Sequence, residues 1–444
     1  MLGFKKRTFH GGVHPPEGKQ YTEKKPIEKM PAPEQVVIPL QQHIGAPSEP
    51  IVKPGDVVKI GDPLSEPKGF VSVPVHASVS GKVLKITPMP HPLGRKVLSV
   101  IIQNDGEDAV SDVMQPNENY MAMEPAEMKK KIQMAGIAGM GGATFPTHVK
   151  LSPPEEKPID TLIINGVECE PYLTADHRLM LEKADEILAG VKILQKILGV
   201  KATYIAIEKN KPDAIKRMQE ITKSDATVEV VPLKVKYPQG AEKQLIKAIT
   251  DREVPTGGLP MDVGCLVQNV GTTRAIYEAL AKGKPLYERV VTVTGPGIKE
   301  PKNLLIRLGT TFQDVIAYCG GYTDDVSKLI SGGPMMGLAQ FSDEVPVIKG
   351  TSGILLLTEK DTRTVDPMPC IGCNRCVDTC PMHLVPTKLA EFADFKRYEE
   401  AEKWGIMDCI ECGTCTFVCP AKRHLLQSIR FGKYEINLEK RKAS

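Results

Sequence analysis

The chain has 444 residues, of which 25% are charged and 41% hydrophobic, and its formal net charge is +3. This length allows about two to four domains with cores of their own, and the nearly balanced charge argues against nucleic acid as the main partner. No run approaches the ~18 apolar residues of a membrane-spanning helix, and the opening MLGFKKRTFHGG lacks the apolar middle of a secretory signal. We therefore expect a cytoplasmic protein, or one that is peripheral on the cytoplasmic side of a membrane.

The first third of the chain predicts an arm and a small β module. Residues 1–35 are rich in Pro, Lys and Gly and predict an irregular arm. Residues 36–115 contain short β-branched segments such as VVIPL and VLSVII, and VKPGDVVKIGDPL and HASVSGKV are similar to the halves of a lipoyl- or biotinyl-type β barrel-sandwich. Those carriers modify a lysine between the halves. The nearest candidate, Lys68, lacks the expected DKA or MKM setting, so we favour a structural barrel.

Three further modules are expected after the barrel. Residues 120–285 alternate helical runs such as LMLEKADEILAGVKILQKIL with strand-like TLIIN and ATYIAIE, which predicts an α/β domain with a largely parallel sheet. Residues 286–360 return to β and resemble the soluble-ligand-binding β-grasp module. Residues 361–444 predict loops and helices around cysteines, followed by a basic tail. The expected fold class is therefore multidomain α/β, with a barrel-sandwich, an α/β domain, a β-grasp module and an α-helical ferredoxin-like domain.

Eight of the eleven cysteines lie in two runs, CIGCNRCVDTCP and CIECGTCTFVCP, which share the C-x2-C-x2-C-x3-C-P spacing of [4Fe–4S] ferredoxins. Zinc, the alternative, takes thiolates in pairs of C-x2-C, and three cysteines per run followed by C-P disfavour it. In two-cluster ferredoxins the last cysteine of each run ligates the other cluster. The expected ligands are therefore Cys370, Cys373, Cys376 and Cys419 for cluster 1, and Cys409, Cys412, Cys415 and Cys380 for cluster 2.

A glycine-rich loop is the candidate flavin site. Clusters carry single electrons, so a two-electron donor needs an adaptor such as a flavin. In AGIAGMGGATFPTHVKL, Gly136, Gly139, Gly141 and Gly142 would let backbone N–H groups approach a phosphate or a planar ring. The loop fails the G-x-G-x-x-G pattern at Thr144, and no Gly-Lys-Ser/Thr of a P-loop follows. Taken alone, it is equally consistent with a glycine-rich turn that binds nothing.

Four motifs in the same order resemble the FMN- and NADH-binding subunit of respiratory complex I. GMGGATFPTHVK is similar to its flavin loop, NGVECEPYLTADHR to its NADESEP segment, YPQGAEKQL to its Y-x-x-G-E-E-T-A-L motif, and VQNVGT to its NNVET motif. With the barrel before these motifs and the β-grasp module and cysteine runs after them, the whole chain resembles the RnfC family, the C subunits of Rnf electron-transport complexes. The opening FHGGVHPPEGK is also similar to that family's N-terminus.

This resemblance implies non-covalent FMN, with NADH as substrate and no catalytic side chain, because FMN carries the hydride. By position, the implied FMN contacts are Gly139, Gly141, Lys150, Asn165, Glu168, Gly240, Gln268, Asn269 and Thr272. The implied NADH contacts are Phe145, Glu170 and Glu242. The chain departs from the family motifs at Val167, Cys169, Ala241, Gln268 and Gly271. With these departures, fewer acidic side chains would line the nucleotide pocket.

The resemblance also implies a role in a larger assembly. It implies a peripheral electron-input subunit on the cytoplasmic side of the inner membrane, passing electrons from NADH and FMN singly through two clusters to partner subunits. Those partners are a ferredoxin-like iron–sulfur subunit and membrane subunits that couple NADH:ferredoxin oxidoreduction to Na⁺ or H⁺ transport. Two alternatives stay open: a soluble cobalamin reductase of a propanediol-utilisation microcompartment, which shares these modules, and a flavin-free electron relay.

Overall fold

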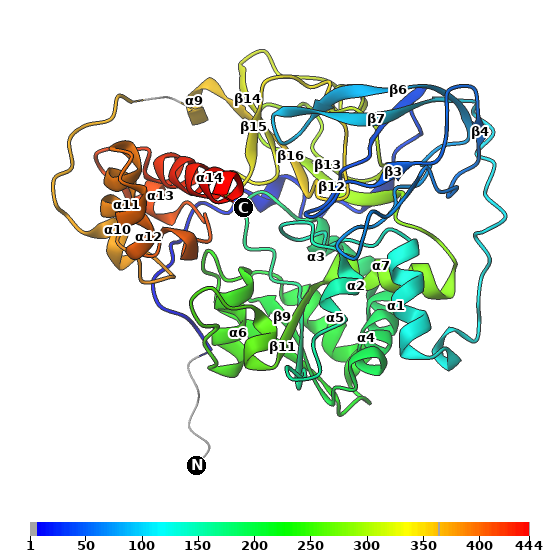
Figure 1. Ribbon diagram of the computed structural model, residues 1–444, viewed down its shortest axis with the longest axis horizontal. Coiled ribbons are helices and arrows are strands. Elements are labelled where there is room, and N and C mark those ends of the chain that lie inside the picture. The colour runs from blue at the N-terminus through cyan, green and yellow to red at the C-terminus, as the bar shows by residue number, and fades with distance from the viewer. Residues whose placement is uncertain (1–6, 363–364, 444) are drawn as a thin grey trace.

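The computed structural model describes residues 7–362 and 365–443. Residues 1–6 of the predicted arm, and residues 363, 364 and 444 of the predicted C-terminal domain, lie outside the described part. The predicted fold class is confirmed: a barrel-sandwich, an α/β domain, a β-grasp module and a helical cysteine-rich domain follow one another along the chain. In Figure 1 the barrel (blue) and the β-grasp module (yellow) lie above the α/β domain (green), and the cysteine-rich domain (orange to red) lies to one side.

The barrel module is a four-stranded sheet of order β2-β7-β6-β4, with a two-stranded ribbon of β3 and β5. Four buried side chains from paired positions build its core: Val36 pairs with Ile102, and Ile38 pairs with Val100. Val37 between them is also buried, but outside this core. Its strands are β2 (Gln35–Pro39), β3 (Glu49–Pro50), β4 (Val57–Val58), β5 (Ser65–Glu66), β6 (Gly81–His91) and β7 (Arg95–Asn104).

The α/β domain has four parallel strands in the order β10-β9-β8-β11, as the alternation of helices and strands predicts. Helices cover both faces of this sheet, so the centre of β8 is continuously apolar, and Leu162, Ile163 and Ile164 are all buried. The elements are η2 (Tyr120–Ala122), α1 (Pro125–Met134), α2 (Thr147–Lys150), β8 (Thr161–Asn165), α3 (Ala175–Glu182), α4 (Ala184–Leu198), β9 (Ala202–Glu208), α5 (Pro212–Thr222), β10 (Val228–Leu233), α6 (Glu242–Thr250), η3 (Pro260–Val263), β11 (Cys265–Asn269) and α7 (Val270–Ala281).

The β-grasp module completes a six-stranded sheet of order β1-β13-β12-β16-β14-β15, whose edge strand β1 (Ile27–Lys29) comes from the N-terminal arm. Its buried Val291, Leu304 and Phe312 belong to the same apolar cluster as Leu162 and Ile164 of the α/β domain, so the two modules share one core. The remaining elements are β12 (Glu288–Thr294), β13 (Lys302–Arg307), α8 (Phe312–Tyr318), β14 (Val326–Ser331), β15 (Leu338–Gln340), β16 (Gly353–Thr358) and α9 (Glu359–Thr362).

The arm has little secondary structure besides β1 and the short helix η1 (Lys19–Tyr21), yet it contacts several modules. Gly12 N–H donates to the carbonyl of Thr379 in the cysteine-rich domain, at 2.8 Å. The next residue, Val13, exchanges two hydrogen bonds with Tyr237 of the α/β domain, at 2.8 and 2.9 Å. Figure 1 shows the arm running past the cysteine-rich domain before it reaches the β-grasp sheet.

The cysteine-rich domain is helical and has a small core of its own. Leu389, Phe392, Leu425 and Ile429 pack there with the thiols of Cys415 and Cys419. None of the helices in residues 7–362 and 365–443 has the length and apolar character needed to cross a membrane. The helices are α10 (Arg375–Asp378), α11 (Pro386–Asp394), α12 (Tyr398–Lys403), η4 (Ile406–Asp408), α13 (Thr414–Val418) and α14 (Leu425–Ala443).

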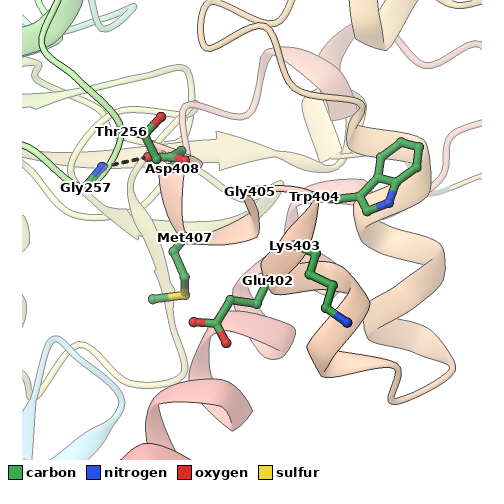
Figure 2. Close-up of a pocket in the computed structure, with 8 residues that line it drawn as sticks. All are labelled: Thr256, Gly257, Glu402, Lys403, Trp404, Gly405, Met407 and Asp408. Carbon is green, nitrogen blue, oxygen red and sulfur yellow. Dashed lines mark hydrogen bonds between the residues drawn. The ribbon is translucent and has the colours of Figure 1, made fainter.

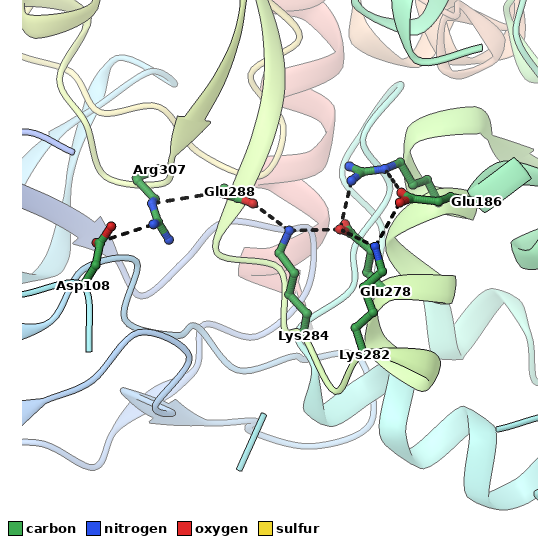
Figure 3. A network of polar contacts seen from close by, with 8 residues as sticks. Asp108, Glu186, Glu278, Lys282, Lys284, Glu288 and Arg307 are labelled. Carbon is green, nitrogen blue, oxygen red and sulfur yellow. Dashed lines mark hydrogen bonds and ion pairs between the residues drawn. The ribbon is translucent and has the colours of Figure 1, made fainter. Parts of the chain in front are cut away.

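A network of ion pairs connects the α/β domain, the β-grasp module and the barrel (Figure 3). Lys284 Nζ lies 3.0 Å from Glu278 on α7 and 2.6 Å from Glu288 on β12, and Arg307 on β13 reaches Asp108 at 3.5 Å. Burial would lower the pKa of Lys284, but the attraction of the two glutamates outweighs burial and raises it. Lys284 is therefore a charged bridge between two modules.

Candidate functional site

The strand order reverses at the carboxyl ends of β8 and β11, and we use the word crevice for this edge of the sheet. From β8 the chain crosses to β9 on one side, and it later returns to β11 on the other side of β8. Asn165 ends β8 and pairs in register with Asn269, which ends β11. In open parallel sheets, ligands bind outside the carboxyl ends of the strands where the order reverses in this way. The fold alone therefore marks this edge of the sheet as the candidate site.

The glycine-rich loop between α1 and α2 lies against this crevice. Its base is closed by a hydrogen bond from Gly139 N–H to the Phe145 carbonyl, at 2.9 Å. The N–H of Met140 donates to Thr272 Oγ1 on α7, at 2.9 Å. A β-carbon on Gly141 would lie 2.6 Å from the side-chain nitrogen of Asn269, so this position has room for glycine alone. The loop therefore lies directly on the ends of the strands.

Peptide groups at the tip of the loop are free to bind a ligand. Gly141, Gly142 and Ala143 are exposed. Within the described residues, their N–H groups donate to no protein acceptor. Successive free N–H groups form a site for anions such as a phosphate. This arrangement fits the phosphate-bearing ligand that the sequence predicts.

Polar side chains from four segments converge on the same edge. Lys150, at the end of α2, donates to the carbonyl of Val267 at 2.8 Å and to Glu242 Oε1 at 2.7 Å. Asn165 Nδ2 donates to the Gly240 carbonyl at 2.9 Å. An ammonium, a carboxylate and an amide side chain are thus gathered near the carboxyl ends of the strands.

One buried amide near the strand ends lacks a partner. Gln268 on β11 is only 3% exposed, and its side-chain oxygen has no hydrogen-bond partner among the described residues. A buried polar atom without a partner is costly, and such atoms in native structures usually meet a ligand or water. Gln268 therefore adds to the fit between this crevice and a polar ring system such as a flavin.

Glu168 and Asn269 act here as helix caps. Glu168 has a backbone φ of +45°, and its carboxylate accepts hydrogen bonds from the N–H groups of Asp176 at 2.7 Å and His177 at 3.2 Å, at the start of α3. The side-chain oxygen of Asn269 accepts from Gly271 N–H at the start of α7. Its amide group donates to Asp176 Oδ2 at 2.7 Å. Two helix N-termini thus face the crevice, which favours negative charge there.

Asp176 belongs to this edge, although it is absent from the predicted contacts. Burial, and then the nearby carboxylate of Glu168, raise the pKa of Asp176. A signal was available, because Asp176 lies inside the NGVECEPYLTADHR motif. That motif predicted contacts at its asparagine and its two glutamates alone.

The three predicted NADH contacts fall into two groups. Phe145 is half-buried at the base of the loop, and Glu242 lies next to Lys150. Glu170 lies away from the glycine-rich loop. Its carboxylate accepts hydrogen bonds from Met336 N–H at 2.8 Å and from Met335 N–H at 3.2 Å. Both methionines follow β14 in the β-grasp module. The structure therefore brings Phe145 and Glu242 to the crevice and places Glu170 at a boundary between modules.

The first cysteine set surrounds a small cavity in the C-terminal domain. Thr387 Oγ1 donates to Cys370 Sγ at 3.8 Å. The N–H of Gly372, then Thr387, and also Arg423, lower the pKa of Cys370, which favours a thiolate. The cavity is lined by Cys370, Cys373, Cys376 and Cys419, that is, three cysteines of the first run and the last cysteine of the second.

The second cysteine set is more enclosed. Burial raises the pKa of Cys415 to about 12 and that of Cys409 to about 11, and the thiols of Cys412 and Cys380 add to the effect at Cys409. The thiol of Cys380 is thus close enough to interact with Cys409 and Cys412 of the second run, and it also interacts with Cys376 of its own run. In the described part of the chain, no three Cys, His, Asp or Glu side chains meet as they would around a single metal ion. The ligands of a [4Fe–4S] cluster each bind a different iron, so four cysteines that hold a cubane need not converge on one point.

The second set adjoins the α/β domain. Tyr237, which follows β10, donates its hydroxyl to the Cys412 carbonyl at 2.8 Å, and these two residues pack together with Val13 of the arm. Cys169 lies against the same cluster, and its sulfur accepts from Gly240 N–H at 3.2 Å. A continuous path of contacts thus leads from Gly240 at the crevice, through Cys169 and Tyr237, to Cys412.

A separate hollow opens between the α/β domain and the cysteine-rich domain (Figure 2). Gly257 N–H donates to Asp408 across it at 3.2 Å, and Trp404 borders it. None of its lining residues is a predicted ligand of a cluster, FMN or NADH. We therefore place the chemistry at the strand ends and not in this hollow.

Four segments of the chain match known domain families. The predicted cofactors, FMN and [4Fe–4S] clusters, are confirmed at this level, because two of the four families are defined by them. The matches are residues 132–278 to the Nuo51 FMN-binding domain, 7–107 to the RnfC barrel sandwich hybrid domain, 290–339 to the SLBB domain and 369–423 to the 4Fe-4S dicluster domain.

Relatives match along the whole chain. The chain is 49% identical over 443 residues to the C subunit of the Na(+)-translocating ferredoxin:NAD(+) oxidoreductase complex of Acetobacterium woodii, with 100% of both chains covered. It is 50% identical over 430 residues to the C subunit of the proton-translocating ferredoxin:NAD(+) oxidoreductase complex of Clostridium ljungdahlii, covering 97% of this chain and 94% of that one. A chain of the NAD+-reducing [NiFe]-hydrogenase in the H2-reduced state aligns with a TM-score of 0.50 at 17% identity, covering 71% of this chain and 63% of that one, which shows a shared fold.

The enclosed carboxyl group of Glu170 predicts a pH effect on stability. Burial raises its pKa to about 7, from an ordinary value of 4.5. Between these values the folded chain holds a proton that the unfolded chain releases, so this group's contribution to stability falls as pH rises toward 7. For Glu170→Gln we expect a smaller decrease of the melting temperature between pH 5.5 and 7.5 than in the wild type. The exposed Glu107→Gln should keep the wild-type profile; equal slopes in all three proteins would contradict the buried, protonated state.

Proposed function

The chain belongs to the RnfC family, the C subunits of ion-translocating ferredoxin:NAD(+) oxidoreductase complexes, and we propose that it exchanges electrons between NADH and FMN and passes them singly through two [4Fe–4S] clusters. Bound FMN supplies the conversion between a hydride, which carries two electrons, and single electrons. The observation that carries the proposal is the convergence of the glycine-rich loop, Lys150 and Asn165 at the carboxyl ends of β8 and β11.

The side chains at the strand ends would divide the work of holding FMN. Lys150, already oriented by Glu242 and the Val267 carbonyl, would give the phosphate a charge-assisted hydrogen bond, together with the free N–H groups of the loop. Gln268 and Asn165 offer amide groups to the polar part of the ring. Gly139, Gly141 and Gly240 would allow close approach of the backbone. Glu168, Asn269 and Thr272 would act by fixing the helix starts and the loop.

For NADH, we propose Phe145 and Glu242 as the direct contacts. The ring of Phe145 lies where the loop closes and could stack on a nucleotide base or on nicotinamide. Glu170 would contribute indirectly, because its carboxylate already binds two peptide N–H groups of the β-grasp module. Holding that module against the α/β domain would shape the wall of the nucleotide pocket.

We propose the crossed ligand assignment for the clusters. The cavity that Cys419 shares with three cysteines of the first run supports cluster 1, and the interaction of Cys380 with Cys409 and Cys412 supports cluster 2. The contact between Cys412 and Tyr237 of the α/β domain supports the second set as the one nearer the flavin. Cys370 and Cys373 are exposed, so the first set would face the partner protein.

We propose that the chain is a peripheral subunit on the cytoplasmic side of the inner membrane. The names of its relatives as subunits of ion-translocating complexes support further Rnf subunits as partners, namely a ferredoxin-like iron–sulfur subunit and membrane subunits. Ile371 lies between the exposed cysteines and is itself 70% exposed, which fits a face that transfers electrons by direct contact. One relative is named for Na⁺ and the other for protons as the coupling ion.

An anaerobic NADH titration tests the function. The chain is reconstituted with FMN, iron and sulfide, and its visible and EPR spectra are followed together as NADH is added. We expect bleaching of the flavin absorbance and the appearance of EPR signals from reduced clusters. Protein that contains about eight irons and eight sulfides, but no flavin and no NADH-dependent change, would instead be a flavin-free relay.

The fit of the phosphate site is tested by Lys150→Met. Because a hydrogen bond to a charged group contributes about 1.5–3 kcal/mol, we expect FMN to bind roughly 10- to 100-fold more weakly. Lys157→Met is the matched control, since Lys157 also pairs with a carboxylate, Asp262, but lies near the opposite end of the same strands. FMN affinity is measured by fluorescence quenching. Equal losses in the two variants would exclude a specific role for Lys150.

The crossed ligand assignment is tested by Cys380→Ser. We expect this change to impair the cluster held by Cys409, Cys412 and Cys415, which lies on the flavin side, and to leave the other cluster's EPR signal intact. Cys319→Ser, which alters a buried thiol of the β-grasp module, should leave both signals unchanged. Loss of the cluster held by the remaining cysteines of the first run would show that each run instead ligates its own cluster.

A further inference from the structure

Two buried basic side chains of the β-grasp module reach into the glycine-rich loop. Lys349, in the segment before β16, is fully buried, and its Nζ donates to the Gly136 carbonyl at 2.7 Å and to the Pro74 carbonyl at 2.8 Å. Arg289 on β12 is 6% exposed, and its guanidinium donates to the Met140 carbonyl at 3.3 Å and to the Lys349 carbonyl. The first five residues of the loop are thus held at both ends by another module.

These two cations are unusually placed for residues that would serve packing alone. Within the described residues, Lys349 forms no ion pair with a carboxylate, and burial lowers its pKa to about 7. Burial also lowers the pKa of Arg289 to about 10, although Asp176 partly opposes the effect. Burying an ammonium without a carboxylate partner costs several kcal/mol, which a methionine or leucine at the same place would avoid. Their use at this position therefore needs a reason beyond filling space.

The loop itself supplies that reason. With several glycines it has many backbone conformations, and fixing each residue costs conformational entropy. A loop already fixed when the chain folds avoids this cost when a ligand binds. Lys349 and Arg289 fix its first half, while the barrel fixes its second half through a hydrogen bond from Ile44 N–H to the Thr144 carbonyl, at 3.2 Å.

We propose that Lys349 and Arg289 are positioning residues for FMN, and that the β-grasp module serves the flavin site through them. This inference rests on the proposed function, because it assumes that the loop binds FMN. It gives the module a role in the chemistry of the α/β domain, although no β-grasp residue was among the predicted ligands. Lys349 and Arg289 bind carbonyl groups of the loop, and the N–H groups at its tip stay available for the cofactor.

The test uses the full chain with its clusters, freed of FMN and titrated with FMN by fluorescence quenching. For Lys349→Met we expect the dissociation constant of FMN to rise at least tenfold. At saturating FMN, the visible spectrum of the bound flavin should differ from the wild type, because the loop's peptide groups have moved. A loss of overall stability alone would not change the spectrum of fully bound flavin. The EPR signals of the clusters should be unchanged.

Arg289→Lys keeps the test valid if Lys349→Met does not fold. This variant retains a buried cation but replaces the guanidinium fork, so it should hold only one of the two carbonyls. We expect its FMN dissociation constant to rise severalfold, with the same direction of spectral change. FMN binding within twofold of the wild type would overturn the proposal if both variants show it, or if Arg289→Lys shows it where Lys349→Met does not fold.

Lys284→Met is the matched control. Lys284 is also a largely buried lysine at the boundary between the same two modules, but it contacts glutamates and not the loop (Figure 3). We expect a lower melting temperature with an FMN affinity within twofold of the wild type. An equal loss of affinity in Lys284→Met and Lys349→Met would overturn the proposal in favour of general weakening of the boundary. A wild-type chain that binds no FMN would overturn the proposed function as well, so the two failures are distinguishable.

Discussion

The parallel pairing of β8 with β11 is the constraint on which the site depends. It brings Asn165 and Asn269 side by side at one edge of the sheet and sets the starts of α3 and α7 over the same crevice. The glycine-rich loop can then lie against Asn269 only because Gly141 has no side chain. Each later step, including the orientation of Lys150 by the Val267 carbonyl, follows from where these two strands end.

Around this edge, the other modules act as supports and as a route for electrons. The barrel and the β-grasp module hold the loop from behind, through Ile44 and Lys349. On the opposite side, Tyr237 connects the α/β domain with the peptide that carries Cys412. The arm reinforces this connection, because Val13 pairs with Tyr237. The order of the modules along the chain thus differs from their order along the proposed electron path, in which the last module receives electrons from the second.

Local patterns in the sequence predict much of this structure, because each has a direct physical meaning. The spacing of the cysteines, the short β-branched segments of residues 36–115 and the alternation of helical and strand-like runs in residues 120–285 indicate the right kinds of module. The individual site residues stay predictions, although Lys150 and Asn165 do lie together as their motifs imply. Contacts between distant segments were not predictable. Lys349 reaches Gly136 across 213 positions in the chain, and no local pattern around a lysine records the carbonyl it will meet.

The shared core of the α/β domain and the β-grasp module has a consequence for how the chain can be divided. Leu162 and Ile164 pack in the same cluster as Val291 and Leu304, on the other side of a boundary that looks clear in the sequence. A fragment that ended after α7 would expose that apolar surface to water, and exposed surface of this kind promotes aggregation. Residues 132–278 and 290–339 match two separate domain families, yet in this chain the two modules share one core, so we expect them to fold together.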